Sequence, residues 1–84
     1  MTTLERVRRY IIETCYLSDP AELTDTVSLI DSGIVDSTGM LDVILFIETD
    51  FGISVSDRET TPDNLETIAR IAAFVDRKRA AAVA

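Results

Sequence analysis

Apolar residues recur at helical intervals near the start of the chain, after Thr2 and Glu5, which have the spacing of a capping box. The repeating positions are Leu4, Val7, Ile11 and Cys15. They predict a helix over residues 3–17, which Pro20 and its polar neighbours bring to an end. Because Cys15 lies on the apolar stripe, we expect it to behave as a small buried hydrophobe rather than a reactive thiol.

A second helical pattern lies near the end of the chain and consists of Leu65, Ile68, Ile71, Ala72 and Val75. It predicts a helix over residues 66–79. A short helical turn is expected just before it, because Thr61 can cap a helix whose first position is Pro62. The alanine-rich tail after Arg79 is expected to fray.

The middle of the chain predicts a third long helix, capped by Asp36 or Ser37 and running to about Asp50. Its expected core face consists of Met40, Val43, Ile44, Ile47 and Phe51. Leu41 and Leu45 fall on the opposite, polar side, where no core is available to them.

Residues 18–36 form a long loop, which we expect five apolar residues to anchor to the core. These are Val27, Leu29, Ile30, Ile34 and Val35. Three long helices, one short helix and no alternating strand pattern predict a small all-α four-helix bundle, with residues 1–84 as a single domain.

Composition excludes several kinds of chemistry. The 84 residues include no histidine and one cysteine, so a Ser-His-Asp relay, a Cys-His pair and a Cys- or His-rich metal site are not expected. An independent enzyme is therefore not predicted, and the lone cysteine points to a reducing compartment. No apolar run exceeds five residues, which predicts a protein without a membrane span or signal peptide, located in the cytoplasm.

Charge is concentrated in one part of the chain. The net charge is −7, and residues 31–66 carry nine acidic and one basic side chain. Such a segment disfavours nucleic acid as a partner and favours a partner with a basic surface. A role in solubility alone is the simpler alternative.

Asp36 and Ser37 need no function beyond capping a helix, but the residues around them carry a family resemblance. They stand in Gly33-Ile34-Val35-Asp36-Ser37, followed by Asp50-Phe51-Gly52-Ile53 and then Pro62-Asp63-Asn64-Leu65. Over nearly its whole length the chain resembles the acyl carrier protein family, and its lack of flanking linkers resembles the free-standing members. The resemblance implies that Ser37, preceded by Asp36, bears a 4′-phosphopantetheine arm whose thiol carries acyl or aminoacyl groups as thioesters. Ser32 also follows an aspartate, but it lies too early in the loop and is expected to be a loop residue.

The same resemblance implies a series of enzyme partners. These are a phosphopantetheinyl transferase, a loading ligase or acyltransferase, and downstream synthases or transferases with basic docking patches. Asp42 and Glu48 would steer such partners, and Leu41 and Leu45 would form an apolar spot between them. The family most often has leucine where Thr38 stands, so Leu41 and Leu45 are expected to replace that contact.

Cargo and pathway stay open between fatty acid, polyketide and nonribosomal peptide types. The Gly33–Ser37 run is similar to carriers loaded by separate adenylating ligases, including D-alanyl carriers. Met40 and Phe46 are expected to narrow the pocket between the last three helices, which favours short cargo.

Two other functions are weighed beside the carrier. One is a calcium-binding helix-loop-helix over residues 31–42, which has acids at both ends. Its details disagree with that motif, because Gly33, Val35 and Gly39 stand at ligand positions and Asp36 stands where the turn glycine is needed. The other is a non-enzymatic acidic adaptor that uses the middle helix without any prosthetic group.

Overall fold

The structure is a computed structural model that describes residues 2–15 and 19–83, and all of its regular elements are helical. The α-helices are α1 (Thr3–Cys15), α2 (Ser37–Phe51), α3 (Pro62–Leu65) and α4 (Ile68–Val83), and the 3₁₀ turns are η1 (Pro20–Glu22) and η2 (Asp57–Glu59). The described residues contain no strand. The predicted all-α class, with three long helices and a short one, is therefore confirmed.

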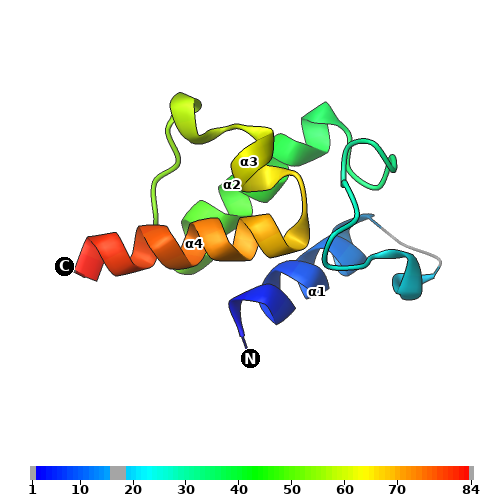
Figure 1. Cartoon of the computed structure of the whole chain (residues 1–84), viewed down its shortest axis with the longest axis horizontal. Helices are drawn as coiled ribbons and strands as arrows, with labels where there is room; N and C mark the ends of the chain where they lie inside the picture. Colours follow the sequence, from blue (N-terminus) through cyan, green and yellow to red (C-terminus); the bar gives the residue numbers. More distant parts are fainter. Residues whose placement is uncertain (1, 16–18, 84) are drawn as a thin grey trace.

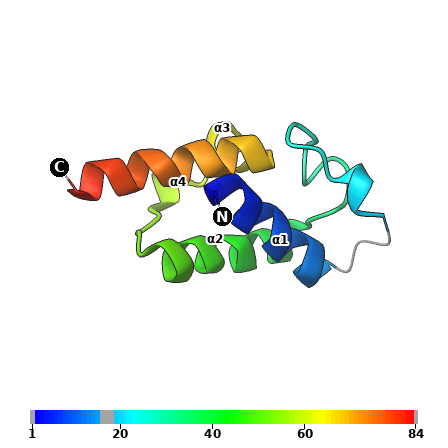
Figure 2. The same cartoon turned by 90° about the horizontal axis from the view of Figure 1, so that it is seen from below.

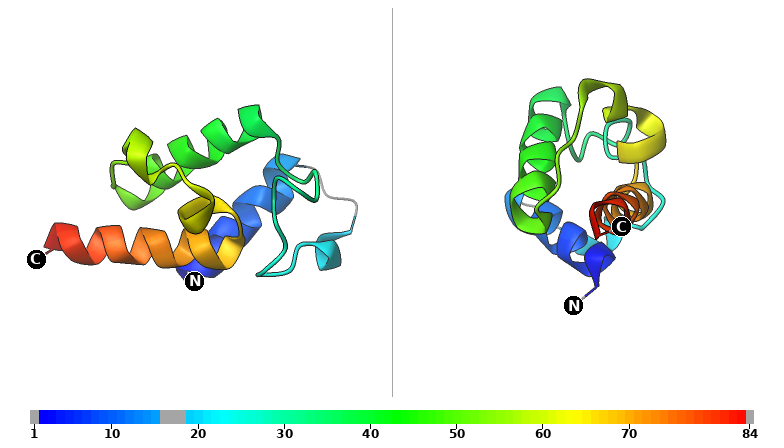
Figure 3. Two further views of the ribbon diagram at one scale, coloured as in Figure 1. Left: turned by 45° about the horizontal axis from the view of Figure 1, so that its top comes forward. Right: turned by 90° about the vertical axis from the view of Figure 1, so that its left-hand side faces the viewer.

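The long helices enclose a common core. α2 and α4 run in the same direction on opposite sides of the molecule, and α1 crosses obliquely between them (Figures 1 and 2). The segment that contains α3 lies across the remaining side, between α2 and α4 (Figure 3). The fully buried side chains come from α1, α2, α4 and the first loop: Val7, Ile11, Leu23, Leu29, Val35, Val43, Ile47, Ile68, Ile71, Phe74 and Val75.

The helix boundaries agree with the predictions at most ends. α1 covers the predicted helix as far as Cys15, and the last two predicted residues lie outside the described part. α4 begins at Ile68, two residues later than predicted, and continues to Val83, so the predicted end of this helix at residue 79 is wrong. Alanine has the highest helix propensity of all residues, and an alanine-rich end can therefore extend a helix that tertiary packing has already started.

The loop before α2 is held to the helices from both sides. Backbone hydrogen bonds run from the Leu29 N–H to the Glu66 carbonyl (2.9 Å) and from the Ala69 N–H to the Asp25 carbonyl (3.0 Å). The Arg8 guanidinium adds an ion pair to Asp25. These bonds satisfy backbone groups that would otherwise be costly to pack against a core, and they fix the residues that lead into α2.

The predicted loop anchors are only partly correct. Leu29 and Val35 are buried, and Val27 and Ile34 are half-buried against the core. Ile30 is 44% exposed, so its assignment as an anchor is wrong. An apolar residue in the loop can pack on the core, but the turn geometry of the loop decides which of these side chains face inward.

Cys15 lies at the end of α1, half-buried against the core. Burial raises the pKa of its thiol, and the negative charge of Asp36 raises it further. Both effects disfavour the thiolate, which is the reactive form. The position of Cys15 agrees with the small hydrophobe that the sequence predicts, although the side chain is less deeply buried than expected.

Candidate functional site

The start of α2 is fixed by Asp36 rather than by Ser37. The Asp36 carboxylate accepts a hydrogen bond from the Gly39 N–H at 2.6 Å, and the Asp36 carbonyl accepts the first helical bond, from Met40. Asp36 itself has an extended backbone, as an N-cap residue requires. Of the two capping candidates in the sequence, the aspartate therefore does the capping.

Gly39 allows this cap to be tight. A Cβ atom at Gly39 would lie 3.2 Å from the Asp36 carboxylate oxygen and 3.3 Å from Val35 Cγ1, closer than side chains normally approach. A residue with a side chain at position 39 would therefore crowd Asp36 and Val35, which explains the glycine. The periodicity and capping patterns gave no sign of this role.

Ser37 is the first residue of α2 and is exposed to solvent. Its hydroxyl forms no hydrogen bond with any residue that the structure describes. The N–H groups of Ser37 and Thr38 belong to the first helical turn, whose donors have no helical acceptor and whose dipole favours a negative group. An uncommitted hydroxyl beside free donors fits a phosphate ester formed at this oxygen.

Ser32, the other serine that follows an aspartate, is already used by the loop. Its hydroxyl donates to the Leu29 carbonyl at 3.3 Å and accepts from the Ile34 N–H at 3.4 Å. The prediction that Ser32 is a loop residue is confirmed.

The outer face of α2 carries the residues that the sequence assigned to partners. Leu41 and Leu45 are 65% and 61% exposed, as the helical pattern predicted, and Thr38 and Asp42 are exposed as well. Glu48 differs, because it is half-buried and one of its carboxylate oxygens accepts a hydrogen bond from the Val55 N–H at 2.9 Å. Part of this carboxylate therefore holds the turn after α2, and the partner-binding role of all five residues stays a prediction.

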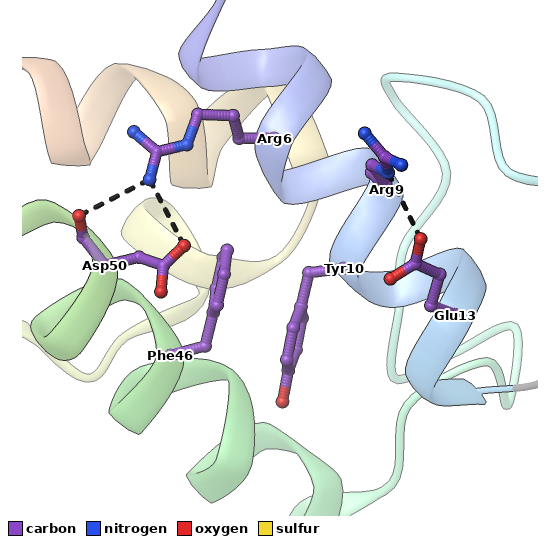
Figure 4. Close-up of a pocket in the computed structure, with 6 residues that line it drawn as sticks. All are labelled: Arg6, Arg9, Tyr10, Glu13, Phe46 and Asp50. Atoms are coloured by element: carbon purple, nitrogen blue, oxygen red, sulfur yellow. Dashed lines mark hydrogen bonds and ion pairs between the residues drawn. The ribbon is translucent and has the colours of Figure 1, made fainter. Parts of the chain in front are cut away.

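Phe46 lies in a groove between α1 and α2 (Figure 4). Its ring stacks on Tyr10 with the centroids 4.0 Å apart, and it meets Phe51 edge to face. The expectation that Phe46 narrows the pocket between α2, α3 and α4 is therefore wrong. On α2, Phe46 lies at the edge of the buried face, where its side chain can turn either toward α1 or toward α3 and α4. The position of α1 beside α2 decides for the first.

The charged side chains of this groove are paired with one another. Arg6 forms an ion pair with Asp50 at 3.2 Å, and Arg9 forms one with Glu13 at 3.1 Å (Figure 4). Burial raises the pKa of the Tyr10 hydroxyl. The groove thus joins α1 to α2, and each of the four charged side chains that line it has a partner of opposite charge.

A small apolar cleft of about 150 Å³ opens on the other side of α2. It is lined by Ile30, Met40, Thr60, Thr61, Pro62, Leu65 and Glu66. Met40 is three residues after Ser37, so the two side chains lie on neighbouring parts of one helix face. Met40 therefore lines a cleft beside α2 and α3, and its narrowing effect on cargo stays a prediction. Ile30 is exposed because it forms a wall of this cleft.

The calcium alternative does not agree with the fold. Residues 37–42 of the supposed binding loop belong to α2, so the stretch cannot wrap around an ion. Among the described residues there is also no group of three or more acidic, cysteine or histidine side chains arranged to hold a metal. Within the same residues, no helix is long and apolar enough to cross a membrane.

Comparison with known proteins gives one consistent result. Residues 5–75 match the family described as "Phosphopantetheine attachment site". The chain is 30% identical over 77 residues to the acyl carrier protein of two strains of Caulobacter vibrioides, a match that covers 92% of this chain and 95% of the relative. The solution structure of a holo acyl carrier protein from Nitrosomonas europaea superposes with a TM-score of 0.77 at 30% identity, covering 95% of this chain and 99% of that one.

Proposed function

The chain belongs to the family of phosphopantetheine-bearing acyl carrier proteins. We propose that Ser37 is the residue to which the phosphopantetheine arm is attached. We also propose that the protein shuttles short acyl or aminoacyl groups between enzymes. The observation that carries the assignment is the division of roles at the start of α2. Asp36 caps the helix, and the exposed Ser37 hydroxyl has no hydrogen-bond partner among residues 2–15 and 19–83.

The residues present fit the prosthetic group. In the attachment reaction the Ser37 oxygen attacks the phosphorus of coenzyme A that bears pantetheine, the bond to the other phosphate breaks, and adenosine 3′,5′-bisphosphate leaves. The serine proton passes to a base of the transferase. The 4′-phosphopantetheine group supplies a terminal thiol that holds cargo as a thioester. The chain's own contribution is to expose the serine and to offer the N–H groups of Ser37 and Thr38 to the phosphate.

We propose that catalysis belongs to the partners. Leu41 and Leu45 form an exposed apolar pair, and Asp42 lies beside them on the same helix. An apolar centre with an acidic rim suits brief, salt-sensitive encounters with basic docking patches. Such patches are expected on the phosphopantetheinyl transferase, on the loading ligase or acyltransferase, and on the downstream synthase or transferase.

The apolar cleft beside α2 supports short cargo. An apolar cavity of about 150 Å³ holds one benzene molecule in another protein, or roughly six carbon atoms. Met40 lines the cleft and lies three residues after Ser37 on α2. We propose that it covers the first carbons of an acyl or aminoacyl group, of fatty acid, polyketide or nonribosomal peptide type, and that longer chains extend beyond it.

The test is the intact mass of the protein after incubation with coenzyme A and a broad-specificity phosphopantetheinyl transferase. Wild type and the control Ser32→Ala are expected to gain one phosphopantetheine, and Ser37→Ala none. If folded wild type gains nothing, the attachment role of Ser37 is refuted. A prosthetic-group-free adaptor on the α2 face then becomes the leading function.

A further inference from the structure

One wall of the apolar cleft is formed by a segment that has no buried side chain of its own. Residues 56–64 are exposed or half-buried throughout, and the nearest buried anchor is Leu65 at the end of α3. From this segment Thr60, Thr61 and Pro62 line the cleft. A wall without buried apolar contacts must be held in position by polar ones.

The polar contacts come from α4. Lys78 forms an ion pair with Glu59 at 3.0 Å, and the Arg77 guanidinium donates to the Asn64 side-chain oxygen at 2.9 Å. Asn64 in turn donates to the Glu59 carbonyl at 3.0 Å. These four side chains, which we name the α4 clamp, join two consecutive residues of a long helix to Glu59 and Asn64, which lie on either side of the cleft-lining residues Thr60, Thr61 and Pro62.

The charges explain why the contacts form here. Residues 57–66 contain four acidic side chains and one basic one, whereas residues 67–84 contain one acidic and four basic. Arg70 adds an exposed ion pair to Asp63 at 3.5 Å on the same side. The basic face of α4 therefore holds an acidic segment that lies directly across from it (Figure 3).

The opposite wall of the cleft cannot follow the segment if it moves. Met40 projects from α2, and Ile30 follows Leu29, whose side chain is fully buried in the core. A displacement of residues 56–64 away from α2 therefore widens the cleft. The α4 clamp opposes that displacement, because α4 is anchored in the core by Ile71, Phe74 and Val75.

We propose that the α4 clamp sets the width of the apolar cleft and thereby the length of acyl group that the carrier shelters. Arg77 and Lys78 act through Asn64 and Glu59, so they are positioning residues that need not touch cargo. This inference rests on the proposed carrier function and on the cleft as the cargo site. One exposed or half-exposed ion pair shifts an equilibrium by about two- to fivefold, so the clamp biases the cleft toward a narrow form rather than locking it.

The experiment uses two variants that break the same ion pair. Glu59→Gln removes the charge but keeps a side-chain oxygen that can accept from the Ser56 N–H, and Lys78→Met keeps an apolar stem of similar length. Arg58→Met is the control, because it removes a positive charge from the same segment and its side chain makes no ion pair with any described residue. Each protein is loaded from butyryl-, hexanoyl-, octanoyl- and decanoyl-coenzyme A, and thioester hydrolysis is followed by intact mass.

Wild type and Arg58→Met are expected to protect butyryl and hexanoyl cargo better than decanoyl cargo. In Glu59→Gln and Lys78→Met, the ratio of decanoyl to butyryl hydrolysis rates is expected to fall by about two- to fivefold. A general loss of stability would change hydrolysis of all chain lengths together, and would leave this ratio unchanged. An unchanged ratio in both variants, beside a chain-length preference in wild type, overturns the inference.

A second measurement needs no cargo. In unmodified protein, amide hydrogen exchange of Leu65 and Glu66, which donate to Thr61 and Pro62, should be about two- to fivefold faster in both clamp variants than in Arg58→Met. Unchanged exchange refutes the clamp whether or not the carrier function holds. Faster exchange in a protein that accepts no phosphopantetheine supports the clamp and refutes the carrier function instead. Faster exchange with no chain-length preference in wild type refutes the cleft as the cargo site.

Discussion

Replacing Asp36 and Ser37 separately by alanine distinguishes the two possible roles of the serine. The Asp36 carboxylate accepts the Gly39 N–H at 2.6 Å, a good N-cap geometry. Losing such a cap typically costs about 1 kcal/mol of unfolding free energy, which corresponds to roughly 4–8 °C in Tm for a domain of this size. Asp36→Asn keeps a capping oxygen and should lose much less.

Ser37→Ala should behave in the opposite way. The hydroxyl is exposed and has no hydrogen-bond partner among the described residues, so its removal should change the unfolding free energy by less than about 0.5 kcal/mol. The same variant should accept no phosphopantetheine at all. Ser37→Ala should therefore keep the stability of α2 and lose the ability to accept phosphopantetheine.

The assay combines thermal and urea unfolding, followed by far-ultraviolet circular dichroism, with mass spectrometry after the transferase reaction. All variants are measured unmodified, so that the prosthetic group contributes nothing to stability. If Ser37→Ala is destabilised as much as Asp36→Ala, the serine hydroxyl caps α2, and the assignment of separate roles to the two neighbours fails.

Three further predictions concern other parts of the molecule. Tyr10→Leu and Phe46→Leu, measured singly and together, should show a coupling of about 0.5–1.5 kcal/mol in unfolding free energy, which is typical of a stacked aromatic pair. If the two effects simply add, the stacking is contradicted. Leu45→Asp should leave Tm nearly unchanged, since the side chain is 61% exposed. It should slow the attachment of phosphopantetheine when the transferase is limiting. An unaffected rate would show that Leu45 does not belong to the partner face. Hydrogen bonding to the Ser56 N–H and to Lys78 lowers the pKa of Glu59 below its usual 4.5. The unfolding free energy that wild type gains over Glu59→Gln should therefore be complete above pH 4.5 and should disappear as the pH falls through the lowered pKa of Glu59. If this gain instead grows in acid, the ion pair is contradicted.

Helical periodicity was sufficient to predict the elements that the core requires. The stripe through Val43, Ile47 and Phe51 fixed which face of α2 is buried, and the same geometry left Leu41 and Leu45 outside. The serine at the start of α2 could also be located, because the capping preference and the family resemblance point to the same two residues. These features depend on local spacing, which a sequence contains.

The errors concern choices made by tertiary contacts. Ile30 is as apolar as Leu29, but the turn at residues 30–33 directs it to the cleft rather than to the core. Phe46 could face either side of α2 until the place of α1 was known. The contacts from α4 to Glu59 and Asn64 join residues 13 to 19 positions apart, and no periodic pattern identifies such pairs.

The cap at the start of α2 has a consequence for how a loaded chain is distinguished from an empty one. The hydrogen bond that closes the helix runs from Gly39 to Asp36 and bypasses the serine between them. Under the proposed function, forming an ester at Ser37 would break no hydrogen bond that the described residues make, and would give the helix no reason to change shape. A partner enzyme would then meet the same outer face of α2 whether the carrier is empty, primed or charged, and would have to identify its substrate by reaching the arm itself.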